Sequence, residues 1–337
     1  MSSRIAFFDT HEFEKEPFRL ANVLPGHEIT FLTTRLDVKT AALAKGFAVV
    51  CAFANDQLDA VCLEVLARGG TNLVALRSAG YNHVDLKAAA ISKIRVVRVP
   101  EYSPYAIAEH VVALIQTLNR KTHKAYNRVR EGNFSLDGLV GFDLHGKTIG
   151  IVGTGRIGKV LAKIMHGFGC SVLLNDIAPD AVFSAGLECQ YVDLHTLLRA
   201  SDIISLHLPL MPATQHCIGA FEFSLMKKGV MLINTSRGGI VDSKALIKAL
   251  KAGQVGQVGL DVYEEEAGRF FEDQSDLVMS DDVLARLLSF SNVLITGHQG
   301  FLTREALTNI ANTTLRNVTD AEEGRPLVNA VSAPFST

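Results

Sequence analysis

The stretch Lys147-Thr-Ile-Gly-Ile-Val-Gly-Thr-Gly-Arg-Ile-Gly158 decides the fold of this chain. It begins with an apolar run that is typical of a strand covered on both faces. Gly153, Gly155 and Gly158 follow in the spacing G-x-G-x-x-G. Apolar residues then recur at positions 157, 160, 161, 164, 165 and 168, which predicts a helix with one buried side. The run at 172–174 predicts the next strand, and Asp176 closes it.

This order of strand, glycine turn, helix, strand and acid predicts a dinucleotide-binding unit. The first glycine allows a tight turn, the second lets a pyrophosphate approach the backbone, and the third lets the helix pack against the strand. The helix N-terminus offers unpaired N–H groups and a partial positive charge to the phosphates. Asp176 would bind the adenosine ribose and repel a 2′-phosphate, so NAD is favoured over NADP. The alternative is a glycine-rich turn in some other α/β protein.

Length and composition narrow the class of protein. The 337 residues are enough for two domains, and 48% hydrophobic with 20% charged residues is ordinary for a globular chain. The net charge of −2 indicates neither a nucleic-acid nor an anionic membrane partner. No apolar run approaches the roughly 20 residues of a membrane helix. Five cysteines without a C-x-x-C pair predict free thiols, a cytoplasmic location and no metal site.

Strand-like and helix-like segments alternate on both sides of the glycine stretch, which predicts α/β architecture with parallel sheets. The expected strands before it are 5–8, 48–53, 73–76 and 94–97, and those after it are 203–206, 230–234, 258–260 and 293–296. One long connecting helix is expected from Pro104 to about Val129. The tail from Pro326 onward is expected to be short and poorly ordered.

Polar residues close several of the later strands, at the edge where open α/β sheets bind ligands. These residues are His207, Arg237, Asp261 and His298. A buried arginine needs an anion, and its planar fork matches a carboxylate bidentately. A structural salt bridge to a nearby acid is the alternative for Arg237.

His298 is the candidate acid/base, because imidazole titrates near neutrality and can deliver a proton to a carbonyl oxygen. Such a base usually has an orienting carboxylate. Asp261 and the cluster Glu264-Glu-Glu266 both qualify, and a solvated acidic loop is the alternative for the cluster. His207 is a rival for the acid role, although Pro209 close behind it favours a part in shaping the cofactor cleft. The other histidines are interpreted as structural or surface groups.

The loop Arg77-Ser-Ala-Gly-Tyr-Asn-His83 follows a predicted strand end. Backbone N–H groups around Ala79 and Gly80 could hold a small anion there. An ordinary loop between a strand and a helix is the alternative.

Taken together, these motifs resemble those of the D-isomer-specific 2-hydroxyacid dehydrogenases, and within that family most of all the bacterial fermentative D-lactate dehydrogenases. The resemblance covers nearly the whole chain. Its motifs are Arg77 to Asp85, Val99-Pro-Glu-Tyr-Ser-Pro104 with Ala108-Glu-His110, Gly153 to Gly158, Asn234-Thr-Ser-Arg-Gly238, Asp261-Val-Tyr-Glu-Glu-Glu266 and Thr296-Gly-His-Gln-Gly-Phe-Leu-Thr303.

The resemblance implies a role for each site residue. Arg237 would bind the substrate carboxylate, His298 would be the acid/base and Glu266 its orienting carboxylate. Asp261 would support the nicotinamide and the histidine. The implied substrate contacts are Phe53, Ala79, Gly80, Tyr102 and Phe301, with the two phenylalanines favouring a small methyl side chain. The implied cofactor contacts are Gly153, Gly155, Arg156, Ile157, Gly158, Asp176, His207, Leu208, Pro209, Thr214, Thr235, Ser236 and Asp261.

The expected fold is therefore two Rossmann-like, doubly wound α/β domains. A discontinuous substrate domain, 1–101 and 299–337, would enclose an inserted NAD-binding domain, 102–298. The expected reaction is reversible reduction of pyruvate to D-lactate by NADH. A dehydrogenase for a bulkier 2-oxo acid and a non-enzymatic NAD-sensing scaffold are the alternatives. The expected partners are a small-molecule substrate and further copies of the chain, as a dimer or tetramer.

Overall fold

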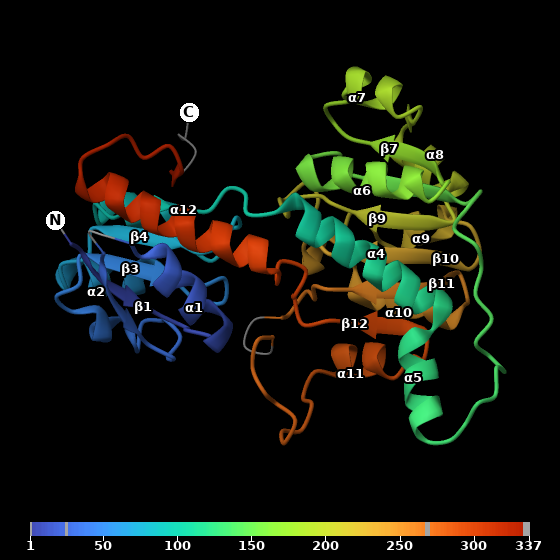
Figure 1. Cartoon of the computed structure of the whole chain (residues 1–337), viewed down its shortest axis with the longest axis horizontal. Helices are drawn as coiled ribbons and strands as arrows, with labels where there is room; N and C mark the ends of the chain where they lie inside the picture. Colours follow the sequence, from blue (N-terminus) through green and yellow to red (C-terminus); the bar gives the residue numbers. More distant parts are fainter. Residues whose placement is uncertain (1, 24–25, 267–269, 333–337) are drawn as a thin grey trace. The chain divides into compact units, whose positions relative to one another are not determined.

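The computed structural model describes residues 2–23, 26–266 and 270–332. The chain forms two compact units (Figure 1). Unit 1 joins Met1–Ser103 to Phe301–Thr337, and unit 2 is the continuous segment Pro104–Gly300. The sequence predicted domain boundaries after residues 101 and 298. The observed boundaries lie after residues 103 and 300, two residues later in each case.

Unit 1 contains a six-stranded sheet in the order β13-β5-β4-β3-β1-β2. Five strands are parallel neighbours in the doubly wound order 2-1-3-4-5, and β13 pairs antiparallel with β5 at one edge. The strands are β1 (Arg4–Phe7), β2 (Glu28–Phe31), β3 (Val49–Ala52), β4 (Leu73–Leu76), β5 (Arg95–Val97) and β13 (Ala330–Val331). The helices are α1 (Glu12–Ala21), α2 (Ala60–Arg68), α3 (Leu86–Ile91) and α12 (Arg304–Glu322), with a 3-10 helix at Ala41–Ala44.

Unit 2 contains a seven-stranded sheet in the order β12-β11-β10-β9-β6-β7-β8, and every pair of neighbours is parallel. The strands are β6 (Thr148–Val152), β7 (Ser171–Asn175), β8 (Gln190–Tyr191), β9 (Ile203–Leu206), β10 (Val230–Asn234), β11 (Val255–Leu260) and β12 (Val293–Ile295). Strand order reverses between β6 and β9, which is where doubly wound sheets open a ligand crevice at the carboxyl ends. The fold class expected from the sequence is confirmed.

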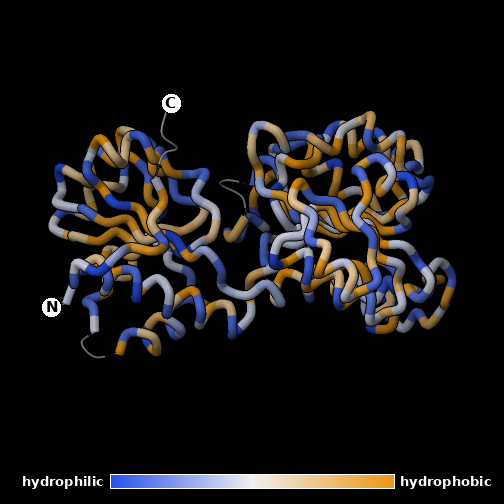
Figure 2. The backbone as a smooth tube through the Cα atoms, turned by 90° about the horizontal axis from the view of Figure 1, so that it is seen from above, coloured by the Kyte–Doolittle hydropathy of each residue, from blue (hydrophilic) through white to orange (hydrophobic). Residues whose placement is uncertain are grey.

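Helices cover both faces of the unit 2 sheet, which accounts for the apolar runs of its strands. They are α4 (Pro104–Arg120), α5 (Thr122–Arg130), α6 (Arg156–Gly167), α7 (Ala181–Gly186), α8 (Leu194–Ala200), α9 (Ala220–Leu225), α10 (Ser243–Lys251) and α11 (Asp282–Leu288), with a 3-10 helix at Gly238–Ile240. Residues of β6, β9 and β10 are almost all buried. Figure 2 shows the hydrophobic residues concentrated along the interior strands of each unit. None of the described helices combines the length and apolarity that a membrane span requires.

Two expectations about secondary structure were wrong. The helix expected from Pro104 to about Val129 is two helices, because Lys121 adopts a left-handed conformation with φ of +51° between α4 and α5. The Lys121 ammonium group donates to the backbone carbonyls of Gly138 and Val140, so contacts distant in sequence hold the break. The described part of the tail is also more ordered than expected, since β13 pairs with the edge strand β5, whereas residues 333–337 lie outside the described residues.

Candidate active site

Two strand ends meet at the point where the order of the unit 2 sheet reverses. β6 and β9 are parallel neighbours, and the His207 N–H donates to the carbonyl oxygen of Val152 at 2.7 Å. Gly153 follows β6 with φ of +94°, and a Cβ at this position would lie 2.6 Å from the carbonyl oxygen of His207. Only glycine permits both this backbone conformation and this close approach.

The other two glycines of the motif differ in what surrounds them. A Cβ on Gly158 would lie 2.1 Å from the carbonyl oxygen of Gly153, so this glycine lets α6 pack against the turn. A Cβ on Gly155 would meet no protein atom within 4 Å. Gly155 therefore faces open space at the N-terminus of a twelve-residue helix, where unpaired N–H groups attract an anion. This arrangement fits a dinucleotide pyrophosphate.

Asp176 lies beyond β7 and is anchored to the glycine turn. Its Oδ2 accepts hydrogen bonds from the Thr154 N–H at 2.6 Å and from the Thr154 hydroxyl at 3.1 Å. Partial burial works to raise the pKa of Asp176, but hydrogen bonds from Ala178 and Thr154 hold it below its usual value. The neighbouring Ile177 is fully exposed and uncharged. The carboxylate thus presents a negative charge where a ribose diol fits and a 2′-phosphate does not.

His207 is not suited to proton donation at neutral pH. Its Nε2 lies 2.8 Å from the hydroxyl of Ser205, and His207 keeps some solvent exposure. Desolvation of the ring nevertheless lowers the pKa of His207 to about 4. At pH 7 only about one molecule in a thousand would carry a protonated His207. This finding favours the cleft-shaping interpretation of His207 over the acid role.

The segments that follow β9 and β10 contribute further polar groups. Leu208 and Pro209 lead into a turn in which the Thr214 hydroxyl donates to the Pro209 carbonyl oxygen at 2.6 Å. Thr235 follows β10 and is buried, and its hydroxyl oxygen has no hydrogen-bond partner in the part of the chain that the structure describes. An unpartnered hydroxyl at the carboxyl ends of the strands fits a hydrogen bond to a bound cofactor, because buried polar groups are normally paired.

The Arg237 loop is held by the buried side chain of Asn234. The Asn234 amide donates to the Arg237 carbonyl oxygen at 2.9 Å and accepts from the N–H and the hydroxyl of Ser236. The half-buried Arg237 side chain donates to the Ser236 carbonyl oxygen at 2.6 Å. Among the described residues it has no acidic partner, so the salt bridge considered for it is absent there.

Gly238 brings the Arg237 loop against the acidic segment that follows β11. A Cβ on Gly238 would lie 2.0 Å from the carbonyl carbon of Tyr263 and 2.3 Å from the backbone nitrogen of Glu264. The Tyr263 N–H in turn donates to Glu266 Oε2 at 3.1 Å. These contacts link the arginine loop to Glu266 through one short stretch of backbone.

His298 contacts one of the four carboxylates that the sequence left open as its partner. Its Nδ1 lies 2.9 Å from Glu266 Oε1, and each side chain is about one fifth exposed. Glu264 instead pairs with His216, and Glu265 is exposed. His298 itself has φ of +56° and its N–H donates to the Thr296 carbonyl oxygen, so it sits on a tight left-handed turn.

Asp261, at the end of β11, is buried and surrounded by donors from its own chain. It accepts from the Thr296 hydroxyl at 2.6 Å, the Gln299 N–H at 2.8 Å and the Gly300 N–H at 2.8 Å. His110 Nε2 lies 3.2 Å from the same carboxylate. Burial works to raise the pKa of Asp261, but the hydrogen bonds from His110, Thr296 and Gly300 keep it below its usual value.

In unit 1, three of the expected substrate residues follow strand ends, with Phe53 after β3 and Ala79 and Gly80 after β4. Neither the Ala79 N–H nor the Gly80 N–H donates to a protein acceptor within the described segments. The loop is fastened by the Ser78 hydroxyl, which donates to the Gly80 carbonyl oxygen, and by the Arg98 guanidinium, which donates to the Ala79 carbonyl oxygen. These open N–H groups fit a small anion.

Aromatic side chains of unit 1 adjoin one another in a chain that we call the aromatic wall. The ring of Phe301 lies 6.4 Å from that of Tyr102 and 6.1 Å from that of Phe13. Phe13 stacks on His11 at 5.3 Å, and His11 lies 5.1 Å from Phe53. The wall therefore brings Tyr102, Phe301 and Phe53 into one connected set.

Three contributors to these arrangements were not predicted from the sequence. His110 was interpreted as structural or surface, yet it contacts Asp261, and its place in the Ala108-Glu-His110 motif was the available signal. Asn234 was quoted only as part of a motif, although its side chain holds the arginine loop. Phe13 was not singled out, and nothing in its neighbourhood in the sequence distinguishes it.

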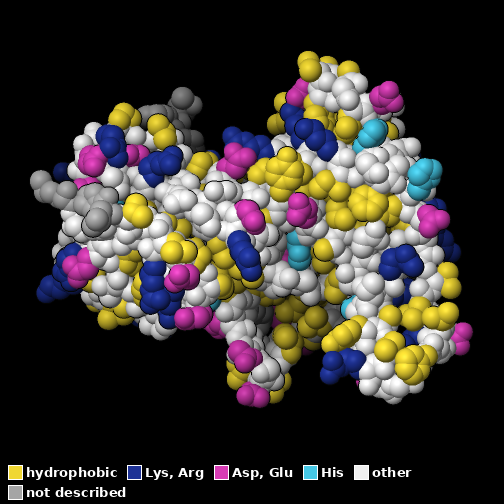
Figure 3. All heavy atoms as spheres, in the orientation of Figure 1, with side chains coloured by type: hydrophobic (Ala, Val, Ile, Leu, Met, Phe, Trp, Pro, Cys, Tyr) yellow, Lys and Arg dark blue, Asp and Glu magenta, His cyan; other side chains and the backbone are white. Residues whose placement is uncertain are grey.

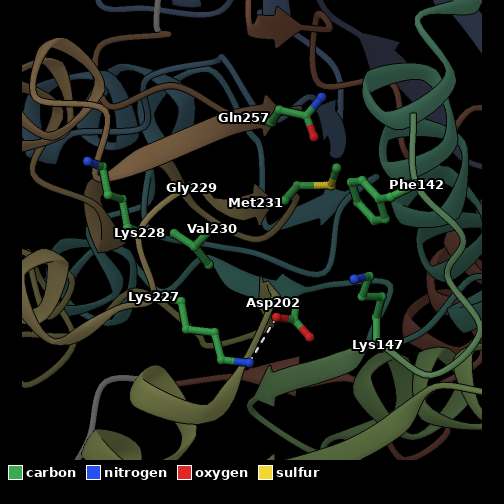
Figure 4. A pocket seen from close by; sticks show the side chains of 9 residues that line it. All are labelled: Phe142, Lys147, Asp202, Lys227, Lys228, Gly229, Val230, Met231 and Gln257. Atoms are coloured by element: carbon green, nitrogen blue, oxygen red, sulfur yellow. Dashed lines mark hydrogen bonds and ion pairs between the residues drawn. The ribbon is translucent and has the colours of Figure 1, made fainter. Parts of the chain in front are cut away.

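A cavity of about 220 Å³ lies elsewhere in unit 2, at the amino ends of the sheet strands. Figure 4 shows Lys147, Lys227 and Asp202 on one side of it and Met231 with Phe142 on the other. Lys227 pairs with Asp202 at 2.8 Å, and none of the expected site residues lines this cavity. In the described ranges, no group of three or more His, Cys, Asp or Glu residues could hold a metal ion.

Comparison with known proteins defines the class. Residues 112–300 match the description "D-isomer specific 2-hydroxyacid dehydrogenase, NAD binding domain". A 2-hydroxyacid dehydrogenase homolog of Schizosaccharomyces pombe is 53% identical over 94% of this chain and 96% of its own. The D-lactate dehydrogenase of Escherichia coli is 47% identical over 97% of this chain and 99% of its own. A solved structure of the pyruvate reductase of Chlamydomonas reinhardtii superposes with a TM-score of 0.91 at 45% identity, covering 97% and 98% of the two chains.

The glycine turn, the anchored Asp176 and the open α6 N-terminus are those of an NAD-binding oxidoreductase. The chain belongs to the D-isomer-specific 2-hydroxyacid dehydrogenase family, as expected from its motifs. It is an NAD-dependent 2-hydroxyacid dehydrogenase, and its cofactor is NAD.

Proposed function

We propose that this enzyme reduces pyruvate reversibly to D-lactate, with NADH as the reductant. The observation that carries the proposal is the hydrogen bond between Glu266 and His298, at the edge of the sheet where the cofactor residues lie. The similarity to a D-lactate dehydrogenase and to a pyruvate reductase supports this choice of substrate.

In this proposal Arg237 binds the substrate carboxylate. Its guanidinium has no acidic partner among the described side chains, and its planar fork matches a carboxylate with two parallel hydrogen bonds. Holding the carboxylate fixes the carbonyl group of the 2-oxo acid before reaction. The bound NADH supplies the hydride that reduces the carbonyl carbon.

His298 is the proposed proton donor. Its Nδ1 is engaged by Glu266, so Nε2 is the ring atom that faces the substrate oxygen in this mechanism. The protonated ring gives its Nε2 proton to the carbonyl oxygen as the C–O double bond becomes a single bond. The negative charge of Glu266 stabilises the protonated ring and holds its orientation. Lactate oxidation reverses these steps, with His298 as the base.

The proposed cofactor residues divide by what they offer. Gly153, Gly155 and Gly158 shape the turn, and the N–H groups of Arg156 and Ile157 would face the pyrophosphate. Asp176 would accept hydrogen bonds from the adenosine ribose. The remaining residues would contact the nicotinamide half of the cofactor or shape the cleft around it. They are His207, Leu208, Pro209, Thr214, Thr235, Ser236 and Asp261.

Unit 1 is the proposed substrate domain. The open N–H groups of Ala79 and Gly80 are the proposed contacts of unit 1 with the substrate carboxylate. Phe53, Phe301 and Tyr102 belong to the aromatic wall, which would leave room for a methyl group and oppose larger side chains. This restriction favours pyruvate over branched-chain or aromatic 2-oxo acids.

A steady-state assay of NADH oxidation tests the proposal. We expect kcat/KM for pyruvate to exceed that for a branched-chain 2-oxo acid and for phenylpyruvate. A preference for either larger acid would assign the enzyme to that substrate instead. Binding of NADH without turnover of any of the three would support the non-enzymatic scaffold.

The proposed partner is a second copy of the chain. Tyr126 and Val129 on α5, together with Phe134, Leu136 and Val140 beyond it, are large apolar residues that are each at least half exposed. Figure 3 shows hydrophobic side chains on the surface in this region of unit 2. Such a patch is typical of an association surface. Light scattering should give a dimer or tetramer that the double substitution Phe134→Ser and Leu136→Ser dissociates.

The buried thiols of Cys51, Cys62 and Cys170 support a cytoplasmic location.

A further inference from the structure

The loop that carries His298 is held on both sides by one carboxylate. Before His298, the Thr296 hydroxyl donates to Asp261 Oδ1. After it, the N–H groups of Gln299 and Gly300 donate to Asp261 Oδ1 and Oδ2, each at 2.8 Å. His298 lies between these anchors in a left-handed conformation that is unfavourable for a residue with a side chain. The surrounding contacts must therefore maintain it.

His110 completes this arrangement from a different element. It lies on α4, far from the loop in sequence, and its Nε2 is 3.2 Å from Asp261 Oδ1 and 3.1 Å from the Thr296 hydroxyl oxygen. Because Asp261 is an acceptor, Nε2 carries the hydrogen in this contact. A Cβ on Gly300 would lie 2.9 Å from Asp261 Oδ2 and 3.5 Å from the His110 ring. The loop thus packs directly on the His110–Asp261 pair.

We propose that His110 is a positioning residue of the dehydrogenase reaction, acting through Asp261 on the backbone of the loop at 296–300. In this role His110 acts through its contacts with Asp261 and Thr296 and not on the substrate directly. It fixes the orientation of the Asp261 carboxylate, and that carboxylate fixes the turn from which His298 reaches Glu266. The kinetic test of this inference measures pyruvate reduction, so that part rests on the proposed function.

The first test measures the loop without reference to activity. Amide hydrogen exchange in a peptide spanning 294–302 reports the N–H groups of Gln299 and Gly300. In His110→Phe, which keeps the ring bulk and removes the donor, we expect exchange there to quicken at least several-fold. In Glu109→Gln, an exposed neighbour on the same helix, exchange should match that of the wild type. Unchanged protection in His110→Phe would overturn the inference.

The second test separates positioning from packing by kinetics. Small displacements of a reacting group cost about ten- to a hundredfold in rate. We therefore expect His110→Phe to lower kcat at least tenfold, while the KM for pyruvate and the affinity for NADH change less than about threefold. His110→Gln places an amide N–H where Nε2 lies and should restore most of kcat. His110→Asn is polar but too short, and should not.

Each outcome decides the question. Equal losses in the Gln and Asn variants would mean that only the shape of the imidazole matters, which overturns the positioning role. If His110→Phe does not fold, the comparison of Gln with Asn still decides it. A wild-type enzyme that fails to reduce pyruvate would contradict the proposed function, while the exchange measurement would continue to test the loop anchor.

Discussion

Glu266 Oε1 and His298 Nδ1 lie 2.9 Å apart, although the two residues are 32 positions apart in the chain. The neighbouring acids make other arrangements, with Glu264 paired to His216 and Glu265 exposed. The Glu266 carboxylate is held from its other oxygen as well, because its Oε2 accepts from the Tyr263 N–H. Of the three acids at positions 264–266, Glu266 is therefore the one that contacts the His298 ring.

Replacing Glu266 by glutamine should lower kcat for pyruvate reduction by roughly 10²–10⁴-fold, because the neutral amide neither holds the ring nor stabilises its charge. Stopped-flow or steady-state kinetics would measure this loss, and NADH affinity from fluorescence should stay nearly constant. Glu265→Gln is the matched control and should behave as the wild type. A large loss in Glu265→Gln with little effect in Glu266→Gln would contradict the assignment.

Arg237→Lys should raise the KM for pyruvate at least tenfold and also lower kcat. Lysine keeps the charge but loses the planar, bidentate contact with a carboxylate. Steady-state kinetics with pyruvate measure both constants. Arg199→Lys, an exposed substitution on α8, provides the control. Near-wild-type constants for Arg237→Lys would rule out substrate binding by this residue.

Asp176→Ser combined with Ile177→Arg should shift cofactor preference toward NADPH. Loss of the carboxylate removes hydrogen bonds to the ribose, and hydrogen bonds to charged groups contribute about 1.5–3 kcal/mol each. We therefore expect kcat/KM for NADH to fall about ten- to a hundredfold while that for NADPH rises. Ile177→Arg alone should change both values less, because Asp176 still repels the 2′-phosphate. An unchanged cofactor ratio in the double variant would contradict the role of Asp176.

The low pKa of His207 predicts a contribution to pH-dependent stability. Desolvation lowers the pKa from 6.5 to about 4, so the folded state holds the ring neutral where the unfolded chain would protonate it. This stabilisation is complete above pH 6.5 and is lost as the pH falls toward 4, by up to about 3 kcal/mol. Urea unfolding at several pH values should show a smaller fall between pH 6.5 and 4 in His207→Gln. If the free energy of unfolding falls equally with pH in both proteins, the low pKa of His207 is contradicted.

Phe13→Ala should enlarge the substrate range. The Phe13 ring contacts both Phe301 and His11 in the aromatic wall, so its removal opens space beside the expected methyl pocket. We expect kcat/KM for a branched-chain 2-oxo acid to rise about tenfold relative to that for pyruvate, since one or two methylenes are worth about 1–3 kcal/mol. Phe221→Ala, on the exposed side of α9, is the control. An unchanged ratio would place Phe13 outside the specificity determinants.

Much of the architecture could be predicted from local patterns. Apolar runs of strand length located β4, β9 and β10 at their observed bounds. The glycine spacing with Asp176 predicted the dinucleotide unit, because each of those residues meets a requirement of the backbone or the cofactor within about thirty positions.

Other features depended on contacts between distant segments. The break at Lys121 is held by carbonyl groups almost twenty positions away, and β13 exists because it pairs with β5. The Ala108-Glu-His110 motif included His110, but only the fold brought Asp261 and Thr296 to it.

The sequence by itself determined two α/β units, an NAD site with its acid, and a short list of side chains able to do the chemistry. Only the tertiary structure decided which carboxylate faces His298, that Arg237 has no acid beside it in the described residues, and that His207 is held neutral. The reason is physical. Helix and strand patterns arise from neighbours along the chain, whereas hydrogen-bond partners and desolvation arise from atoms that folding alone brings together.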